Sequence, residues 1–270
     1  MNYPEILRVL QQEPLAILPS AHASWFSRFE AYLEFRSAKR EDGMIFGEAI
    51  EREQATVVNG VMRLPVGGPV GRNLGPVEKA CGCVDFAEII ADLDTSENDT
   101  NCRGCVIDWD CPGGMVQGGK EVAQRIIDCE KPVYSFSSGL MCSQAYYIAC
   151  ASKALFATED AKVANIGVYC YALDRSKQYA DMGLKPLLIT SGKYKGMGAP
   201  GVPLTKDQIA LLQDEVNVSA EKFYAHVDEM RGGAVSREDM QGQCFAGDVA
   251  AQRGLIDGVI DSWDDVAALL

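Results

Sequence analysis

Residues 105–137 read CVIDWDCPGGMVQGGKEVAQRIIDCEKPVYSFS, and this stretch decides the fold class. It begins with a strand-like apolar run, CVIDWD, and turns through a proline and two glycines. A helical pattern over 115–130 and a second strand-like run, PVYSFS, follow. A strand, a helix and a further strand in this order indicate a parallel pair of strands with a helix packed across its face.

The same alternation extends in both directions along the chain. We expect strands over 55–66, 154–157, 166–171 and 186–190, and helices over 84–93, from near 143, over 174–183 and over 205–231. The last of these is long and amphipathic. The sequence therefore predicts an α/β layered fold with a largely parallel sheet.

Two segments stand outside this alternation. Residues 1–42 carry apolar side chains at helical spacing, which predicts an N-terminal helical extension. Residues 67–76, GGPVGRNLGP, lack the Gly-Lys-Ser/Thr ending that a phosphate-binding P-loop requires. We interpret this glycine- and proline-rich stretch as a flexible surface loop.

Composition excludes several classes of partner. The 270 residues include 38 acidic and 25 basic side chains, giving a net charge of −13. This balance argues against binding to nucleic acid or to anionic lipid, since no basic stripe is present to meet phosphates. The N-terminus does not read as a signal peptide, and no run approaches the length of a membrane span. We therefore expect a soluble, cytoplasmic protein.

The ten cysteines are predicted to be reduced, because many lie inside apolar runs. One cluster, made of Cys81, Cys83, Cys102 and Cys105, raises the question of zinc. Its C-x-C spacing differs from that of the usual paired zinc ligands, and Cys105 opens a buried strand. We predict no metal site, and the role of this cluster stays open.

A serine at residue 143 is the first candidate for chemistry. It lies in GLMCSQAYYIAC, residues 139–150, just before a helical run. A serine in this place either caps the free N–H groups of the helix or serves as a nucleophile at a strand-to-helix corner. The sequence around it is compatible with both roles.

A second corner, Pro112-Gly113-Gly114, follows the preceding strand. Glycines let a ligand approach the backbone closely, and backbone N–H groups can stabilise an oxyanion. If Ser143 opens its helix, the N–H of Gln144 faces the same space as the hydroxyl. The two corners lie at the carboxyl ends of neighbouring strands, where α/β sheets bind ligands.

A nucleophilic serine needs a base. The only histidines, His22 and His226, lie in helical segments that do not suggest a catalytic triad. A lysine whose amine is neutral can also act as a base. Lys193 and Lys195 lie in the glycine-rich stretch 190–200, two residues apart, so their spacing does not choose between them.

The ordered motifs resemble the S49 peptidase family, the signal peptide peptidase A group, over about residues 57–261. This resemblance implies a Clp protease/crotonase-like layered fold, a peptidase domain over 55–265 and a Ser-Lys catalytic dyad without a cofactor. The segments that carry it are 105–114, 131–157, 164–169, 189–198 and 245–257.

The resemblance also implies roles for individual residues. Ser143 falls on the nucleophile and Lys195 on the general base. Gly113 and Gly114 fall on the oxyanion side, where Gly114 is favoured. Asn165 stands where the family usually has a small hydroxyl residue, a position from which it would orient the lysine.

The sequence departs from the family pattern close to the serine. Gln144 and Ala145 replace the glycines that usually follow it, which narrows the pocket but leaves the Gln144 N–H as an oxyanion donor. Cys111 replaces the usual serine before Pro-Gly-Gly.

The opening residues 13–26, EPLAILPSAHASWF, resemble tailed-phage members of the family, which are capsid assembly (prohead) proteases. This resemblance implies cleavage of scaffold, portal or head proteins in the host cytoplasm or the prohead. It also implies a homo-oligomeric ring.

Three alternatives stay open. The departures at Gln144 and Asn165 are compatible with a structural capsid-assembly protein whose peptidase activity is weak or lost. A crotonase-like acyl-CoA enzyme would share the fold and the oxyanion geometry. Cys142, next to the serine, is an alternative nucleophile.

Overall fold

The structure, a computed structural model, describes residues 14–24, 27 and 50–270. The chain divides into two compact units. The larger comprises the described residues of Ala16–Gly167 and Phe223–Leu270, and the smaller comprises Val168–Lys222 together with Pro14 and Leu15. Within the described residues, no helix has the length and apolar character needed to cross a lipid bilayer.

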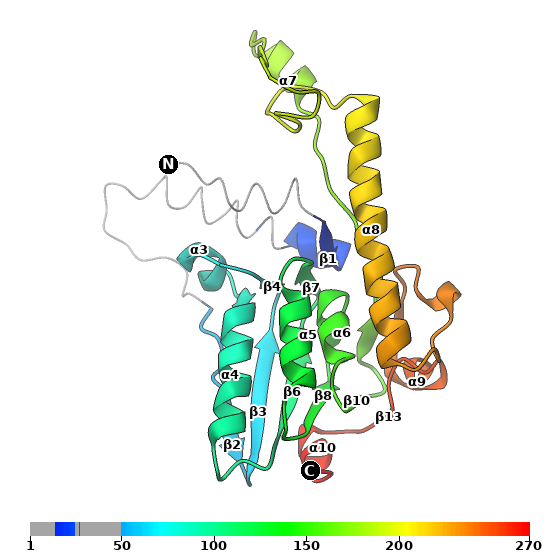
Figure 1. Cartoon of the computed structure of the whole chain (residues 1–270). Coiled ribbons are helices and arrows are strands. Elements are labelled where there is room, and N and C mark those ends of the chain that lie inside the picture. The colour runs from blue at the N-terminus through cyan, green and yellow to red at the C-terminus, as the bar shows by residue number, and fades with distance from the viewer. Residues whose placement is uncertain (1–13, 25–26, 28–49) are drawn as a thin grey trace, which may run out of the picture. The chain divides into compact units, whose positions relative to one another are not determined.

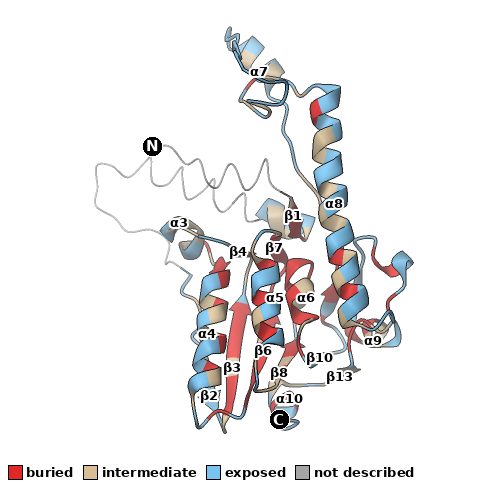
Figure 2. Ribbon diagram, viewed as in Figure 1, coloured by how far each residue is buried: buried red, intermediate tan, exposed pale blue. Residues whose placement is uncertain are grey.

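The main sheet of the larger unit confirms the predicted α/β class. Its strand order is β13-β10-β8-β6-β3-β2, and every pairing except that of β2 with β3 is parallel. Apolar residues of β3, β6 and β8 are buried, as Figure 2 shows for the centre of the sheet. The strands are β2 (Thr56–Val58), β3 (Val61–Gly67), β6 (Gly104–Asp110), β8 (Val133–Ser137), β10 (Ala154–Ala157) and β13 (Gly258–Val259).

Helices α4 (Phe86–Asn98), α5 (Gly119–Ile127) and α6 (Gln144–Ala149) pack side by side along this sheet (Figure 1). Asp85 begins α4 with a capping box that is completed by Glu88. The short helix α10 (Trp263–Ala267) packs its residues Val266 and Ala267 into a separate core cluster with Val61, Val106 and Phe136.

The predicted strand over 55–66 is a hairpin of two strands, β2 and β3. Asn59 and Gly60 form its turn with φ angles of 51° and 76°. Positive φ at both turn residues is the geometry that the Asn-Gly pair favours between antiparallel strands.

The glycine-rich stretch 67–76 is only partly a surface loop. It contains the strand β4 (Val70–Gly71), where Val70 is 2% exposed. This strand belongs to a second sheet with the order β1-β7-β4-β5, so two residues of the stretch form a short buried strand. The other strands of that sheet are β1 (Leu15–Ile17), β5 (Val84–Asp85) and β7 (Gly113–Met115), and the helix α3 (Pro76–Ala80) follows β4.

A third sheet completes the larger unit. Its order is β12-β11-β9, formed by β9 (Leu140–Cys142), β11 (Lys162–Ala164) and β12 (Cys244–Ala246). Strands β9 and β11 are parallel, so the residues next to Ser143 lie against those next to Asn165. The 3-10 helix η1 (Arg237–Asp239) precedes this last strand, and α9 (Gly247–Gln252) follows it.

The predicted helical extension over 1–42 lies mostly outside the described residues. Within it, Leu15–Ile17 is a strand, and residues 19–24 are helical. Pro14 and Pro19 border the strand. A proline interrupts a helix but is tolerated in its first turn, which explains the change of structure at this point.

The smaller unit has less regular structure than predicted. Helices α7 (Ser176–Asp181) and α8 (Lys206–Met230) confirm two predicted helices, and the last part of α8 belongs to the larger unit. The strands predicted over 166–171 and 186–190 do not form, because these segments have no partner strand within the described residues. Tyr169 makes a single bridge to Leu15.

Candidate active site

Ser143 stands at a sharp corner between β9 and α6. Its φ and ψ angles are 54° and −116°, a backbone conformation that residues other than glycine rarely adopt. Its N–H donates a hydrogen bond of 2.6 Å to the carbonyl oxygen of Ala164 on the neighbouring strand. A serine strained between a strand and a helix is the arrangement of a nucleophile elbow.

The side chain of Ser143 does not cap the helix. It occupies the N-cap position, but it accepts no hydrogen bond from the first turn. Its Oγ is buried and has no hydrogen-bond partner among the described residues, and the residue is 1% exposed. Since a buried hydroxyl without a partner lowers stability, this atom is not explained by a structural role.

The strand next to Ser143 is strained as well. Ala164 and Asn165 have φ angles of 82° and 54°. Asn165 is fixed by two bonds, from its N–H to the oxygen of Gln243 at 2.7 Å and from its Nδ2 to the oxygen of Gly242 at 2.6 Å. The carbonyl oxygen of its side chain, Oδ1, is the atom suited to accept a hydrogen bond from a lysine.

Gly113 is the glycine that contacts the serine. Its φ is 103°, and a Cβ added to it would lie 2.8 Å from the Cβ of Ser143. A Cβ added to Gly114 would instead lie 1.8 Å from the oxygen of Val70 on β4. The close approach to the serine is therefore made by Gly113, whereas Gly114 allows the two neighbouring strands to meet.

Gln144 is the first residue of α6, so its N–H has no acceptor within the helix. Its buried side chain lies against α5, where a Cβ on Gly119 would come within 1.6 Å of its Nε2. Gln144 thus fills the space between two helices and leaves its backbone N–H beside Ser143.

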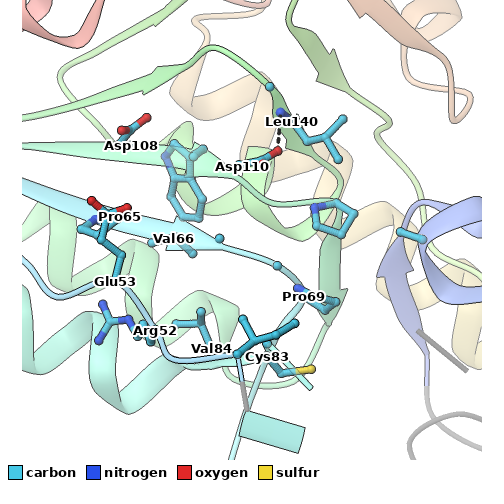
Figure 3. A pocket seen from close by; sticks show the side chains of 18 of the residues that line it. Arg52, Glu53, Pro65, Val66, Pro69, Cys83, Val84, Asp108, Asp110 and Leu140 are labelled. Carbon is cyan, nitrogen blue, oxygen red and sulfur yellow. Dashed lines mark hydrogen bonds between the residues drawn. The ribbon is translucent and has the colours of Figure 1, made fainter. Parts of the chain in front are cut away.

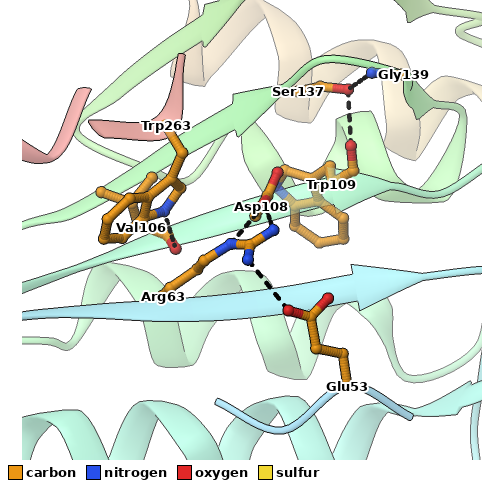
Figure 4. Close-up of polar contacts among 8 residues, drawn as sticks. All are labelled: Glu53, Arg63, Val106, Asp108, Trp109, Ser137, Gly139 and Trp263. Atoms are coloured by element: carbon orange, nitrogen blue, oxygen red, sulfur yellow. Dashed lines mark hydrogen bonds and ion pairs between the residues drawn. The ribbon is translucent and has the colours of Figure 1, made fainter. Parts of the chain in front are cut away.

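Hydrogen bonds connect the two corners. Cys111 donates its N–H to Leu140 at 2.7 Å and accepts at its own carbonyl from Cys142 at 3.1 Å. The hydroxyl of Ser137 donates to the oxygen of Trp109 at 2.7 Å and accepts from the N–H of Gly139 at 3.1 Å (Figure 4). These bonds fix the entry to β9 and so fix the position of Ser143.

The two candidate lysines differ in their surroundings. The Nζ of Lys193 pairs with Asp207 at 2.5 Å, and this hydrogen bond raises the pKa of Lys193. A raised pKa is opposite to what a base at neutral pH needs. Lys195 lies exposed in a turn, and its side chain makes no ion pair or hydrogen bond within the described residues. Both lysines belong to the smaller unit, whereas Ser143, the two glycines, Gln144 and Asn165 belong to the larger one.

Neither histidine bonds to the serine hydroxyl. The Nε2 of His226 lies 2.9 Å from the oxygen of Tyr147, and its ring stacks on that tyrosine with centroids 4.0 Å apart. Burial lowers the pKa of both His22 and His226. Among the described residues, the hydroxyl of Ser143 therefore has no histidine as a hydrogen-bond partner.

Cys142 is a poor nucleophile in this setting. Its pKa is raised, first by a hydrogen bond with Cys244 and then by burial. Its Sγ also lies 3.2 Å from the carbonyl oxygen of Lys162. A thiol that holds its proton reacts slowly, because the thiolate is the attacking species.

All ten cysteines are free, as predicted. Among the four cysteines that raised the question of zinc, Cys102 contacts the hydroxyl of Ser96 at 3.3 Å and the oxygen of Gly104 at 3.0 Å. Burial raises the pKa of Cys105 well above its usual value. Cys102 and Cys105 lie at the start of β6, whereas Cys81 and Cys83 lie between α3 and β5.

A pocket of about 740 Å³ lies at the carboxyl ends of β3 and β6 (Figure 3). Pro112 and Leu140, which flank the two corners, form part of its wall, but Ser143 does not. The remaining wall combines the apolar Val66 and Trp109 with charged groups such as Asp110. Sequence analysis missed this pocket, because segments far apart in the chain form it.

One wall of the pocket is charged. Two nitrogens of Arg63, Nε and Nη2, donate to Oδ2 of Asp108 at 2.9 and 2.6 Å, and Nη1 donates to Glu53 at 3.1 Å (Figure 4). Burial raises the pKa of Asp108, and the contact with Arg63 opposes that shift. This ion pair holds β3 and β6 together at the pocket.

The model of peptidase family S49 matches residues 125–270, more than half of the chain. The chain belongs to this family. Its match begins before the serine corner and extends through Lys195 and the segment 245–257 that sequence analysis assigned to the closing motif.

Several known proteins are similar to this chain. Capsid assembly protease C of Escherichia phage lambda is 26% identical over 99% of this chain and 65% of its own length. Head-tail preconnector protein GP5 of Enterobacteria phage P21 is 27% identical over 79% of this chain and 43% of its own length. A putative signal peptide peptidase SppA of Enterococcus faecium is 25% identical over 67% of this chain and 54% of its own length. The chain thus spans less than two thirds of these relatives.

Among solved structures, a ClpP1 mutant from Listeria monocytogenes is similar, with a TM-score of 0.48 and 13% identity. The alignment covers 75% of this chain and 92% of the ClpP1 chain.

Proposed function

We propose that this protein is a serine endopeptidase in which Ser143 is the nucleophile and Lys195 the general base. The observation that carries the proposal is the buried Oγ of Ser143, which has no hydrogen-bond partner in the described part of the chain and is held in a strained corner beside Gly113. Its peptidase domain covers residues 55–265. Nothing in the chemistry requires a cofactor.

In the first step, Oγ attacks the carbonyl carbon of the scissile peptide bond, and the neutral amine of Lys195 takes its proton. The N–H groups of Gly113 and Gln144 stabilise the oxyanion, with Gly114 as the alternative donor at that corner. Lys195 then gives the proton to the departing amine. Water hydrolyses the resulting ester and restores Ser143.

The choice of lysine rests on what surrounds each candidate. Lys193 is engaged by Asp207, whereas the amine of Lys195 makes no ion pair or hydrogen bond with any residue that the structure describes. Beside the serine and away from water, that amine would be placed to take the proton of Oγ. Asn165, whose Oδ1 is suited to accept a hydrogen bond, would orient the amine as a positioning residue.

The biological role is inferred from the phage relatives, which are named for capsid assembly and head-tail connection. We infer that the substrates are scaffold, portal or head proteins that are cut during capsid maturation. The active form is a homo-oligomeric ring, in the host cytoplasm or the prohead.

The test compares the wild type with Ser143→Ala, Lys195→Ala and Lys193→Ala on an unfolded, fluorogenic protein substrate. We expect activity in the wild type and in Lys193→Ala. The other two variants should lose at least about a thousandfold, because the two groups act as a unit. Circular dichroism checks that all four proteins are folded. Turnover in Lys195→Ala equal to that of Lys193→Ala would exclude Lys195 as the base.

The burial of Ser143 favours a second candidate function, a structural role in capsid assembly with weak or lost peptidase activity. This role predicts that Ser143→Ala supports normal capsid assembly. An assembly defect in that variant, with uncut scaffold protein, would favour the peptidase instead.

A further inference from the structure

The burial of Ser143 raises the question of what covers it. A nucleophile must meet its substrate, yet this serine is 1% exposed. The strand β1 lies beside β7, the strand that begins at Gly113, at the edge of the second sheet (Figure 1). Its residues Leu15, Ala16 and Ile17 are 3%, 0% and 6% exposed.

The contact between β1 and the serine corner is close. The point at which a Cβ of Gly113 would stand lies 2.1 Å from the carbonyl oxygen of Ala16 and 3.0 Å from its carbonyl carbon. The same point lies 2.8 Å from the Cβ of Ser143. A peptide carbonyl group of this chain therefore stands next to both the nucleophile and the oxyanion glycine.

Main-chain hydrogen bonds hold β1 in place. Leu18 donates its N–H to the oxygen of Pro112 at 2.9 Å. Leu15 exchanges two bonds with Tyr169, at 2.8 and 2.9 Å, in an antiparallel bridge. Addition of an extended segment to the edge of a sheet through its backbone is a general way in which proteins bind peptides.

We propose that β1 occupies the strand position of a peptide substrate, and that the bond between Ala16 and Ile17 is a site of self-cleavage. This inference rests on the proposed function of Ser143. The small side chain of Ala16 is fully buried, so the site accepts a small residue on the acyl side of the cleaved bond.

The step is an ordinary hydrolysis. Oγ of Ser143 bonds to the carbonyl carbon of Ala16 while its proton passes to the amine of Lys195. The bond from that carbon to the nitrogen of Ile17 breaks, and this nitrogen takes the proton. Water then divides the ester into the carboxyl group of Ala16 and the free Ser143. The new chain begins at Ile17, and the site becomes open to other peptides.

The test measures the intact mass and the N-terminal sequence of the full chain during incubation at neutral pH. Wild type and Ser143→Ala are compared, and each sample is also given the unfolded substrate used above. We expect the wild type to accumulate a chain that begins at Ile17. Ser143→Ala, which lacks only one oxygen atom, should keep its full mass.

Two further variants test the position of the cut. Ile17→Pro replaces the departing nitrogen by a ring nitrogen without N–H and should block the cut. Ile17→Val is the matched control and should be cut as the wild type is.

The outcomes separate the two proposals. If the wild type cuts the added substrate but stays whole, or is cut at another bond, self-cleavage at Ala16 is excluded and the peptidase function stands. If it cuts neither the substrate nor itself, both proposals are excluded. A chain beginning at Ile17 in Ser143→Ala as well would show that another protease made the cut.

Discussion

At the scale of single residues, strain is concentrated around Ser143. Its positive φ and its unpartnered hydroxyl both lower stability, and neither is offset by a cap or a hydrogen bond. Strain of this kind persists where the surrounding structure enforces it, here through the bond from Ser143 to Ala164.

This strain predicts the relative stability of two inactive variants. Ser143→Gly should have a free energy of unfolding about 1 kcal/mol higher than Ser143→Ala, because glycine adopts a positive φ at little cost and alanine does not. Urea denaturation of both proteins measures the difference. Since neither variant can cut itself, the comparison is free of processing. An alanine variant as stable as the glycine variant would contradict the left-handed conformation.

A second residue-scale prediction concerns Cys244. The hydrogen bond from Cys142 lowers the pKa of Cys244 to about 7, with a smaller contribution from Lys162. The rate of alkylation of Cys244 by iodoacetamide should therefore rise with pH to a midpoint near 7. In Cys142→Ala the midpoint should move upward, because the hydrogen-bond donor is lost. Peptide mass mapping follows the site, and an unchanged midpoint would count against this cause.

The roles of some of these residues could be predicted from the sequence, and the roles of others could not. The serine corner could be recognised because small residues precede a helical run at Ser143. The distinction between Lys193 and Lys195 could not, since it depends on Asp207, which reaches Lys193 only in the folded chain. Likewise, the contact of Gly113 rather than Gly114 with the serine depends on how β7 lies between β1 and β4.

At the scale of elements, α8 supports the helix that Ser143 begins. Tyr147 of α6 packs edge-on against Phe223 with ring centroids 5.2 Å apart and stacks on His226. The long helix was predictable from its periodicity over several turns. Strands such as β1 and β4 are too short to show a period, and pairing with distant segments creates them.

The stacked histidine predicts a pH effect. Burial lowers the pKa of His226, the bond to Tyr147 and the charge of Glu229 oppose this, and Lys120 adds to it. Because the folded pKa is depressed, the neutral ring contributes stability above the unfolded pKa, which is lost as pH falls through the folded value.

His226→Phe keeps an aromatic ring but removes the proton site. Between pH 7 and pH 5, we expect the free energy of unfolding to fall less in this variant than in the wild type, by less than about 1 kcal/mol. Denaturant titrations at both pH values measure it. The background should be Ser143→Ala in both proteins, so that self-cleavage does not interfere. Equal losses would show that His226 does not titrate on unfolding.

The Asn-Gly turn illustrates a signal that was present but not used. Asn59 and Gly60 between two apolar runs indicate a hairpin, whereas sequence analysis treated residues 55–66 as one strand. The opposite error occurred at 186–190, where an apolar run with strand character stays exposed. Composition alone does not provide a neighbouring strand for it.

At the scale of the whole molecule, that exposed run bears on the proposed ring. Leu187 and Ile189 are 81% and 94% exposed in the smaller unit. Large apolar side chains that lie together on a surface are typical of contacts between proteins. We expect a second copy of the chain, which a ring requires, to cover these two side chains.

Leu187→Asp and Ile189→Asp should therefore shift the protein toward monomers, because a carboxylate is costly to bury in a subunit contact. Leu269→Asp, at a side chain that is 55% exposed in the larger unit, is the matched control. Light scattering coupled to size exclusion measures the mass. A wild type that is already monomeric, or variants that keep the wild-type mass, would contradict this role for the segment.

The positive φ angles of Ser143, Ala164 and Asn165 have a practical consequence for directed evolution of this protein. Glycine adopts a positive φ with less strain than these three residues do. A screen that selects only for thermal stability should therefore enrich glycine at these positions. Variants with glycine at residue 143 would resist heat but would lose the proposed nucleophile and with it the peptidase activity. A useful screen must therefore reward heat resistance and cutting together.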